Sequence, residues 1–232
     1  MAAVTKFPGL VSLNGNLLCA IDCETTGIDP RQHDIIEIAI LPLDNHYVPS
    51  RLVRPFVMTM KPERPENINL DALEVNRGKL ADIMANSLPA DKVADFLVEW
   101  FERLNLGFNK RLSPLAHNWP FDRDMIIEWL GPKTFELIFD GRFRDTMSFA
   151  ACMNDCAEEV GELCPYPRVS LGTLATRYHI DHTDAHNALP DCRITAEVYA
   201  AMVKAHCPIP VVDKDKMTFK QEVRCVIDPS ST

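Results

Sequence analysis

Two acidic residues end an apolar run near the start of the chain, within AIDCETTG at residues 20–27. Asp22 and Glu24 lie two positions apart, so on a β-strand both carboxylates would project from one face. Two anions held this close repel each other and raise at least one pKa unless a cation lies between them. Hard divalent ions such as Mg²⁺ or Mn²⁺ prefer such oxygen ligands. The spacing alone decides nothing, because about one such pair is expected by chance and two acids on a solvent-exposed turn would look the same.

Two further acids stand near the starts of predicted helices. Asp122 follows in HNWPFD, and Asp191 follows in HNALPD, five residues after His186. The ordered pattern D-x-E, H-N-x-x-F-D and H-x-A-L-x-D resembles the DEDD exonucleases that carry a histidine in the third motif. These are the relatives of the bacterial replicative polymerase's proofreading subunit, ribonuclease T and oligoribonuclease. The resemblance runs from about residue 17 to residue 205, and INLDALEVNRG at 68–78 resembles the segment between the first two motifs.

The resemblance implies a role for each matching residue. Asp22, Glu24, Asp122 and Asp191 would hold two divalent ions, Mg²⁺ or Mn²⁺, and His186 would be the general base. The implied reaction is hydrolysis of the terminal phosphodiester at a 3′ end, which releases nucleoside 5′-monophosphates. Elementary chemistry agrees, because two ions about 3.5 to 4 Å apart can activate a water and stabilise the leaving oxygen. A histidine near its ordinary pKa of about 6.5 can accept the water's proton at neutral pH.

Pro190 predicts where the last helix begins. Proline is tolerated only in the first turn of a helix, so the helix should start near Ala188. His186 would then lie on the loop before the helix, from which a base can reach over the site. His186 and Asp191 could not share a face of one helix, since five residues turn a helix through about 500°.

Other residues near the motifs are candidate substrate contacts. The resemblance places Thr25 and Thr26 where the terminal nucleotide lies against backbone and side chain. Trp119 and Phe121 flank the second-motif acid and could stack on a base, although an aromatic residue before a helix more often belongs to the core. Asp124 could compete for the metal role, but we interpret it as an ordinary acid in the first turn of a helix.

The elements that must position these residues alternate along the chain. Short apolar or alternating runs predict strands, and apolar residues at helical spacing predict helices. The predicted strands are 17–22, 34–43, 55–62 and 115–118, and the predicted helices are 90–104, 121–130, 147–160, 171–180 and 188–205. This order predicts an α/β fold, and the resemblance specifies a ribonuclease H-like mixed sheet with helices on both faces. In such sheets reactive groups gather at strand ends.

Composition narrows the class of protein. A chain of 232 residues with 47% apolar and 25% charged residues is typical of an ordinary globular protein. The net charge of −9 argues against long-range attraction to nucleic acid, but it leaves room for a polyanion held at one small site with bound cations. The amino terminus shows no secretory signal, and no apolar run approaches the roughly 18 residues of a membrane span. The eight cysteines are too few and too irregular for a disulfide scaffold, so we expect a cytoplasmic protein that does not enter membranes.

We therefore expect residues 1–206 to form a metal-dependent 3′–5′ exonuclease domain that acts on single-stranded ends, with DNA slightly favoured over RNA. An oligoribonuclease or an RNA-processing exoribonuclease is the alternative within the class. A non-catalytic nucleic-acid binding module is disfavoured, because all the matching site residues are present. Residues 207–232 form a C-terminal extension in which 214–227 could be a terminal strand or bind a partner. Relatives occur as homodimers and as subunits of polymerases, and the sequence does not choose between them.

Overall fold

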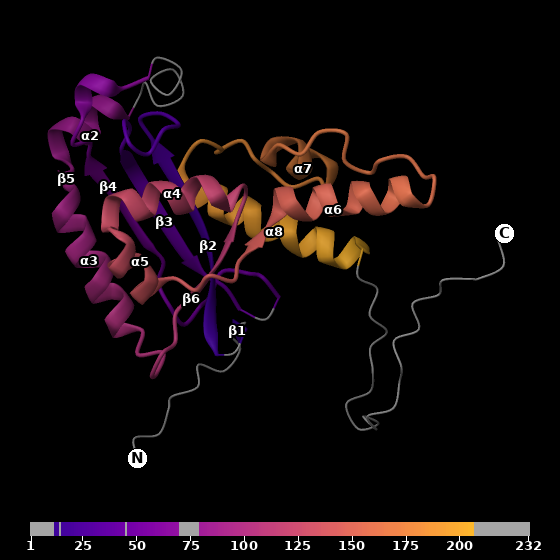
Figure 1. The fold of residues 1–232 in the computed structure, drawn as a ribbon, viewed down its shortest axis with the longest axis horizontal. Coiled ribbons are helices and arrows are strands. Elements are labelled where there is room, and N and C mark those ends of the chain that lie inside the picture. The colour runs from indigo at the N-terminus through magenta and orange to yellow at the C-terminus, as the bar shows by residue number, and fades with distance from the viewer. Residues whose placement is uncertain (1–11, 14, 45, 70–78, 207–232) are drawn as a thin grey trace.

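The strands pair into one mixed sheet. The computed structural model describes residues 12–13, 15–44, 46–69 and 79–206, and the strand order is β5-β4-β3-β2-β6-β7, with β1 paired to β2 (Figure 1). β2 is antiparallel to β3 and parallel to β6, while β3 and β4 are antiparallel. The strands are β1 (Ser12–Leu13), β2 (Asn16–Thr25), β3 (Ile35–Pro42), β4 (Phe56–Lys61), β5 (Leu88–Pro89), β6 (Leu112–Ala116) and β7 (Arg144–Asp145).

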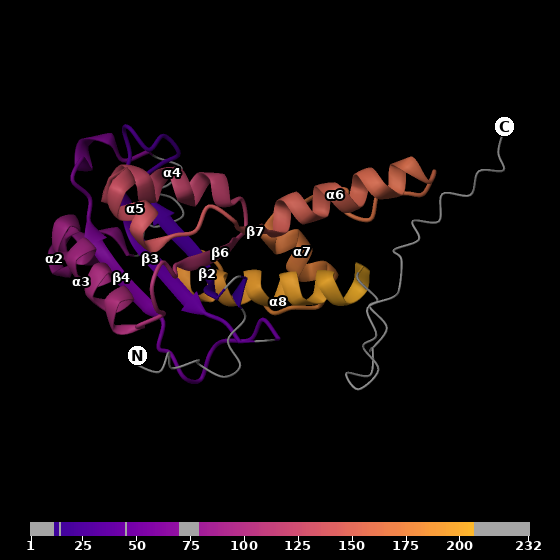
Figure 2. The ribbon, with the colours of Figure 1, turned by 60° about the horizontal axis from the view of Figure 1, so that its bottom comes forward.

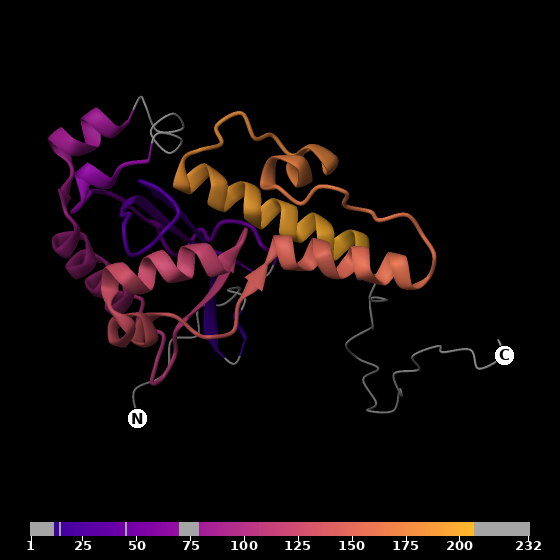
Figure 3. The ribbon, with the colours of Figure 1, turned by 45° about the horizontal axis from the view of Figure 1, so that its top comes forward.

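Helices cover both faces of this sheet, as the sequence predicts. Helices α4 and α5 lie on one side of the sheet and α8 lies on the other (Figure 2). The helices are α2 (Leu80–Asn86), α3 (Ala90–Arg103), α4 (Trp119–Leu130), α5 (Pro132–Ile138), α6 (Thr146–Glu159), α7 (Leu171–Arg177) and α8 (Ala188–His206), with a short 3₁₀ helix, η1 (Pro65–Asn67). Helices α6 and α8 lie side by side beyond β7, with α7 packed against α8 (Figure 3). Within the described residues, no helix is long and apolar enough to cross a bilayer.

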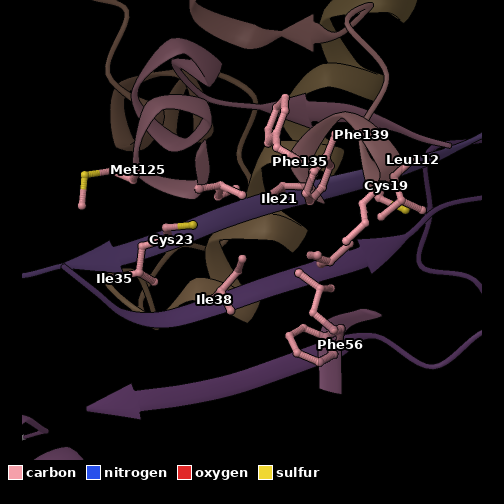
Figure 4. Packing of buried hydrophobic residues seen from close by; sticks show 14 of the residues in the cluster. Cys19, Ile21, Cys23, Ile35, Ile38, Phe56, Leu112, Met125, Phe135 and Phe139 are labelled. Carbon is pink, nitrogen blue, oxygen red and sulfur yellow. The ribbon is translucent and has the colours of Figure 1, made fainter. Parts of the chain in front are cut away.

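The alternation of side chains along β2 divides the core into two layers. Cys19, Ile21 and Cys23 belong to the cluster that β2 forms with α3, α4 and α5 (Figure 4). Leu18 and Ala20 belong to the second cluster, which contains α8. Both faces of β2 are therefore buried, which explains its continuous apolar run. The next even positions of β2 continue the face that is covered by α8, and these positions are the two acids of the first motif.

The predicted elements correspond to observed ones, with differences at their ends. The strand predicted at 115–118 is wrong in its placement, because β6 spans Leu112–Ala116 and Asn118 turns away with a φ of +70°. Pro114 lies inside β6, where it removes a donor that strand patterns normally contain. Helix α7 ends at Arg177, before His179 with its φ of +56°. Helices α2 and α5 were not expected, and the terminal strand considered over 214–227 lies outside the described residues.

Candidate active site

Three carboxylates converge at the carboxyl end of β2. One oxygen each of Asp22, Glu24 and Asp191 lies within 4.8 Å of the other two. Strand β2 presents the first two toward α8, and α8 begins at Ala188, so that Asp191 stands in its first turn. The positive end of the helix dipole favours an anion at that position. We call these three residues together with Asp122 the acid cluster.

Asp122, in the first turn of α4, is not a member of the group that meets within 4.8 Å, but repulsion from its charge contributes to the raised pKa of Asp22. The side chain of Asp122 is 3% exposed, and its Oδ1 accepts a hydrogen bond from the backbone N–H of Cys23 at 3.0 Å. The pairing of β2 with β6 ends at Ala20 and Leu115, so β6 offers no backbone acceptor to the N–H of Cys23. The carboxylate of Asp122 is the acceptor for this N–H. Burial raises the pKa of Asp122 to about 8, because a charged group loses its hydration there.

The pKa values of the other three acids of the cluster are also raised. Burial is the main cause that raises the pKa of Asp22, followed by repulsion from Asp122, Asp191 and Glu24. Burial also raises the pKa values of Glu24 and Asp191. Oδ1 of Asp191 is buried without a hydrogen-bond partner among the described residues. Oxygen donors that repel one another around an unpartnered carboxylate oxygen fit hard divalent cations such as Mg²⁺ and Mn²⁺.

His186 lies on the loop immediately before α8, where Pro190 predicts it. Its backbone is left-handed, with a φ of +69°, and its side chain is exposed. The His186 N–H donates to Oδ2 of Asp191 at 3.2 Å, which closes the loop onto the first turn of the helix. Burial raises the pKa values of Glu24 and Asp191, and the imidazole of His186 acts on both in the opposite direction.

Two charged residues beside the cluster were missed by sequence reasoning. Glu37 lies on β3 directly opposite Glu24 in the strand register, and its charge contributes to the raised pKa of Asp22. Lys79 precedes α2, and its Nζ lies 3.5 Å from Oε2 of Glu37 and 2.6 Å from the carbonyl oxygen of His186. An acid inside the apolar run IIEIAIL was a usable signal for Glu37, since such a position is normally buried. No local pattern marks Lys79.

The two candidate threonines at the end of β2 and in the turn after it differ in burial and in hydrogen bonding. Thr26 is 1% exposed, and its hydroxyl accepts the Asp34 N–H at 2.9 Å. Its side chain therefore holds the turn together, and the expected contact of Thr26 with substrate stays a prediction. Thr25 is half-buried and donates its hydroxyl to the carbonyl of Gly27 at 2.8 Å. A Cβ at Gly27 would lie 2.2 Å from the His33 ring, so this tight turn requires glycine.

The two candidate aromatic residues, Trp119 and Phe121, differ in their exposure. Trp119 is 1% exposed and packs against the rings of Phe135 and Phe139 in the core, which is the alternative that the sequence left open, and base stacking by Trp119 stays a prediction. Phe121 is half-buried and leaves part of its side chain exposed beside the acid cluster's Asp122. Asp124 is exposed and paired with Arg123 at 2.8 Å, in agreement with its interpretation as a helix-surface acid.

Comparisons with known proteins identify relatives of this chain. A family model described as Exonuclease (RNase_T) matches residues 19–199. The chain is 27% identical over 188 residues to the DNA polymerase III subunit epsilon of Rickettsia felis, a match that covers 78% of this chain and 72% of the relative. It is 26% identical over 184 residues to DNA polymerase III PolC-type of Thermotoga petrophila, which covers 79% of this chain but 12% of that protein.

Solved structures share the fold. A complex of E. coli ExoI with single-stranded DNA superposes with a TM-score of 0.62 at 20% identity, over 83% of this chain and 41% of that chain. The nuclease domain of 3′hExo, described as a DEDDh family member bound to rAMP, gives a TM-score of 0.62 at 17% identity, over 85% of this chain and 96% of that domain. The present chain therefore spans less than half the length of the ExoI chain.

The mixed sheet with helices on both faces is the ribonuclease H-like fold that these solved structures share. With most of its length matched by the family model, the chain belongs to the exonuclease family, in its DEDDh group of 3′–5′ exonucleases. Members of this group are metal-dependent phosphodiester hydrolases.

Proposed function

We propose that this chain removes nucleotides one at a time from the 3′ end of single-stranded nucleic acid and releases nucleoside 5′-monophosphates, with DNA preferred to RNA. The observation that carries the proposal is the convergence of Asp22, Glu24 and Asp191 within 4.8 Å. Relatives named as DNA polymerase III subunits and the ExoI complex with single-stranded DNA support the DNA preference. The structure of 3′hExo bound to rAMP keeps an exoribonuclease as the second candidate.

The four carboxylates of the acid cluster would hold two divalent ions, Mg²⁺ or Mn²⁺. When bound, such ions activate the attacking water and stabilise charge on the leaving oxygen. The protein contributes the arrangement of the ligands: β2 fixes Asp22 and Glu24, α4 fixes Asp122 and α8 fixes Asp191. The hydrogen bond from Cys23 to Asp122 orients that carboxylate. Because the ligands are set on rigid elements, little reorganisation would be needed on binding.

His186 would accept the proton of the attacking water as a general base. Its imidazole is exposed, and the loop before α8 ties its backbone to Asp191 of the cluster. The bond from its N–H to Asp191 ties the position of the base to a ligand of the proposed metal site. A positioned base of this kind contributes about 10²- to 10⁴-fold in rate.

Substrate contacts would come from the turn after β2 and from the start of α4. Residues 25–27 follow Glu24 directly in the chain, and we place the terminal nucleotide against the backbone of this turn and the side chain of Thr25. The exposed part of Phe121 offers a surface on which a base could stack. Relatives named as polymerase subunits support association with a polymerase over a homodimer as the larger assembly of this chain.

A degradation assay on matched substrates tests the proposal. Single-stranded DNA and RNA of one sequence, each labelled at the 5′ end, are incubated with the protein and Mg²⁺ or Mn²⁺, with and without chelator. The proposal predicts a ladder that shortens stepwise from the 3′ end, faster on DNA and absent with chelator. Faster degradation of RNA would favour the exoribonuclease, and binding without degradation would refute the catalytic proposal. Asp22→Asn should abolish the ladder, and Asp124→Asn is the matched control.

A further inference from the structure

One ammonium group joins three separate parts of the chain beside the acid cluster. Lys79 stands immediately before α2, and its Nζ donates to the backbone carbonyl of His186 at 2.6 Å. The same Nζ lies 3.5 Å from Oε2 of Glu37, whose side chain is 13% exposed on β3. Lys79 therefore connects the start of α2, the strand opposite Glu24 and the loop that carries the proposed base.

The backbone of His186 depends on such contacts for its conformation. A φ of +69° is uncommon for a residue with a side chain, and it persists only where the surroundings determine it. The N–H of His186 is held by Asp191 at 3.2 Å, and its carbonyl is held by Lys79. The exposed imidazole is not packed into the core. These two anchors hold the backbone from which the imidazole extends.

The pairing of Lys79 with Glu37 bears on whether the ammonium positions the loop or binds a substrate phosphate. Glu37 pairs with the ammonium at 3.5 Å, so the two formal charges sum to zero. The ammonium does lower the pKa values of Glu24 and Asp191, and Glu37 opposes it at both residues. The two contacts occupy donors of Nζ and fix its position between β3 and the loop. These features favour a geometric role over direct capture of a substrate phosphate.

We propose that Lys79 is a positioning residue that, anchored by Glu37, holds the backbone of His186 so that the imidazole faces the acid cluster. The inference rests on the proposed function of His186 as the base. Loss of the anchor should misplace the base without removing a group that touches substrate. Misplaced supporting contacts of this kind cost about 10- to 100-fold in activity.

A double-mutant cycle tests the inference. Lys79→Met and Lys79→Arg are prepared in the wild type and in His186→Ala, with Lys92→Met as the matched control on the exposed surface of α3. We expect Lys79→Met to lower kcat about 10- to 100-fold with little change in KM. Lys79→Arg, which can still donate to both partners, should recover most of the rate. In the His186→Ala background, Lys79→Met should have no further effect.

Other outcomes would overturn the inference. An equal loss of kcat in both backgrounds would mean that Lys79 does not act through His186. A rise in KM alone would indicate a phosphate contact, and weakened Mn²⁺ binding would indicate a role in the charge balance of the cluster.

A second readout separates failure of this inference from failure of the proposed function. Histidine is labelled with ¹⁵N, and the imidazole signals of His186 are identified by their loss in His186→Ala. Lys79→Met should shift or broaden these signals and leave those of His182 unchanged, whether or not the protein degrades nucleic acid. Unchanged His186 signals would refute the positioning role even in an active enzyme, whereas an inactive wild type would refute the proposed function.

Discussion

Asp122→Asn should stabilise the cation-free protein at alkaline pH while it abolishes nuclease activity. Asparagine keeps an oxygen where Asp122 Oδ1 accepts the Cys23 N–H, and it removes the charge from a side chain that is 3% exposed. Burial raises the pKa of Asp122 from 3.8 to about 8. At about 1.4 kcal/mol per pKa unit, this shift corresponds to a cost of up to about 6 kcal/mol for carrying the charge above pH 8.

The sign of the pH dependence follows from the direction of the shift. Because the folded pKa lies above the unfolded one, the stability that Asp122 contributes is fully present below about pH 4 and is lost as the pH rises through about 8. The asparagine NH₂ group loses water on burial, which costs about 1 to 3 kcal/mol. The net gain for Asp122→Asn should therefore be about 2 to 5 kcal/mol at pH 9 and close to zero at pH 5.

Urea unfolding in the presence of chelator at pH 5 and pH 9 measures this difference. Asp124→Asn is the control, because Asp124 is exposed and should change the free energy of unfolding by less than about 0.5 kcal/mol at either pH. A gain for Asp122→Asn that is the same at both pH values would show that the buried charge is not its cause. A loss of stability for Asp122→Asn at pH 9 would refute the argument that the buried charge of Asp122 destabilises the cation-free protein.

Three other changes have expected outcomes. His186→Ala should lower the rate about 10²- to 10⁴-fold; a loss of less than about tenfold would contradict the base role, with His182→Ala as the control. A 3′-phosphate should sharply slow the first cleavage, because the turn at 22–27 should enclose a free 3′-hydroxyl, and equal rates on both ends or cutting of circular strands would indicate an endonuclease. Trp119→Ala should reduce the free energy of unfolding by about 3 to 5 kcal/mol, whereas Phe121→Ala should mainly raise KM, and thermal melts with steady-state kinetics distinguish the two.

The sequence alone predicted the position of a site residue correctly where the geometry of a single strand or helix determines that position. Strand alternation placed Asp22 and Glu24 on one face, because side chains two positions apart on a strand always share it. The position of Pro190 located the start of α8, because a helix interior excludes proline. Both deductions depend only on the backbone of a single element, so they needed no knowledge of its neighbours.

Local sequence patterns could not predict contacts between residues of different helices, strands and loops. Lys79 is 107 positions from His186, and nothing near either residue predicts their hydrogen bond. Trp119 was a candidate for stacking because it lies near Asp122 in the sequence, but α5 covers its ring through Phe135. Thr26 is buried by the pairing of its turn with Asp34, eight residues later. Each of these residues is placed by packing that forms only when distant segments meet.

Titration of the protein with Mn²⁺ examines the proposed metal site itself. Binding is measured by calorimetry, with a deoxynucleoside 5′-monophosphate present, for the wild type, Asp22→Asn and Asp124→Asn. Because Asp22 lies among the other acids of the cluster, the wild type and Asp124→Asn should bind two ions per chain, and Asp22→Asn should lose at least one of them. Equal binding by the wild type and Asp22→Asn, or no binding by the wild type, would contradict the assignment of the acid cluster as the metal site of an exonuclease.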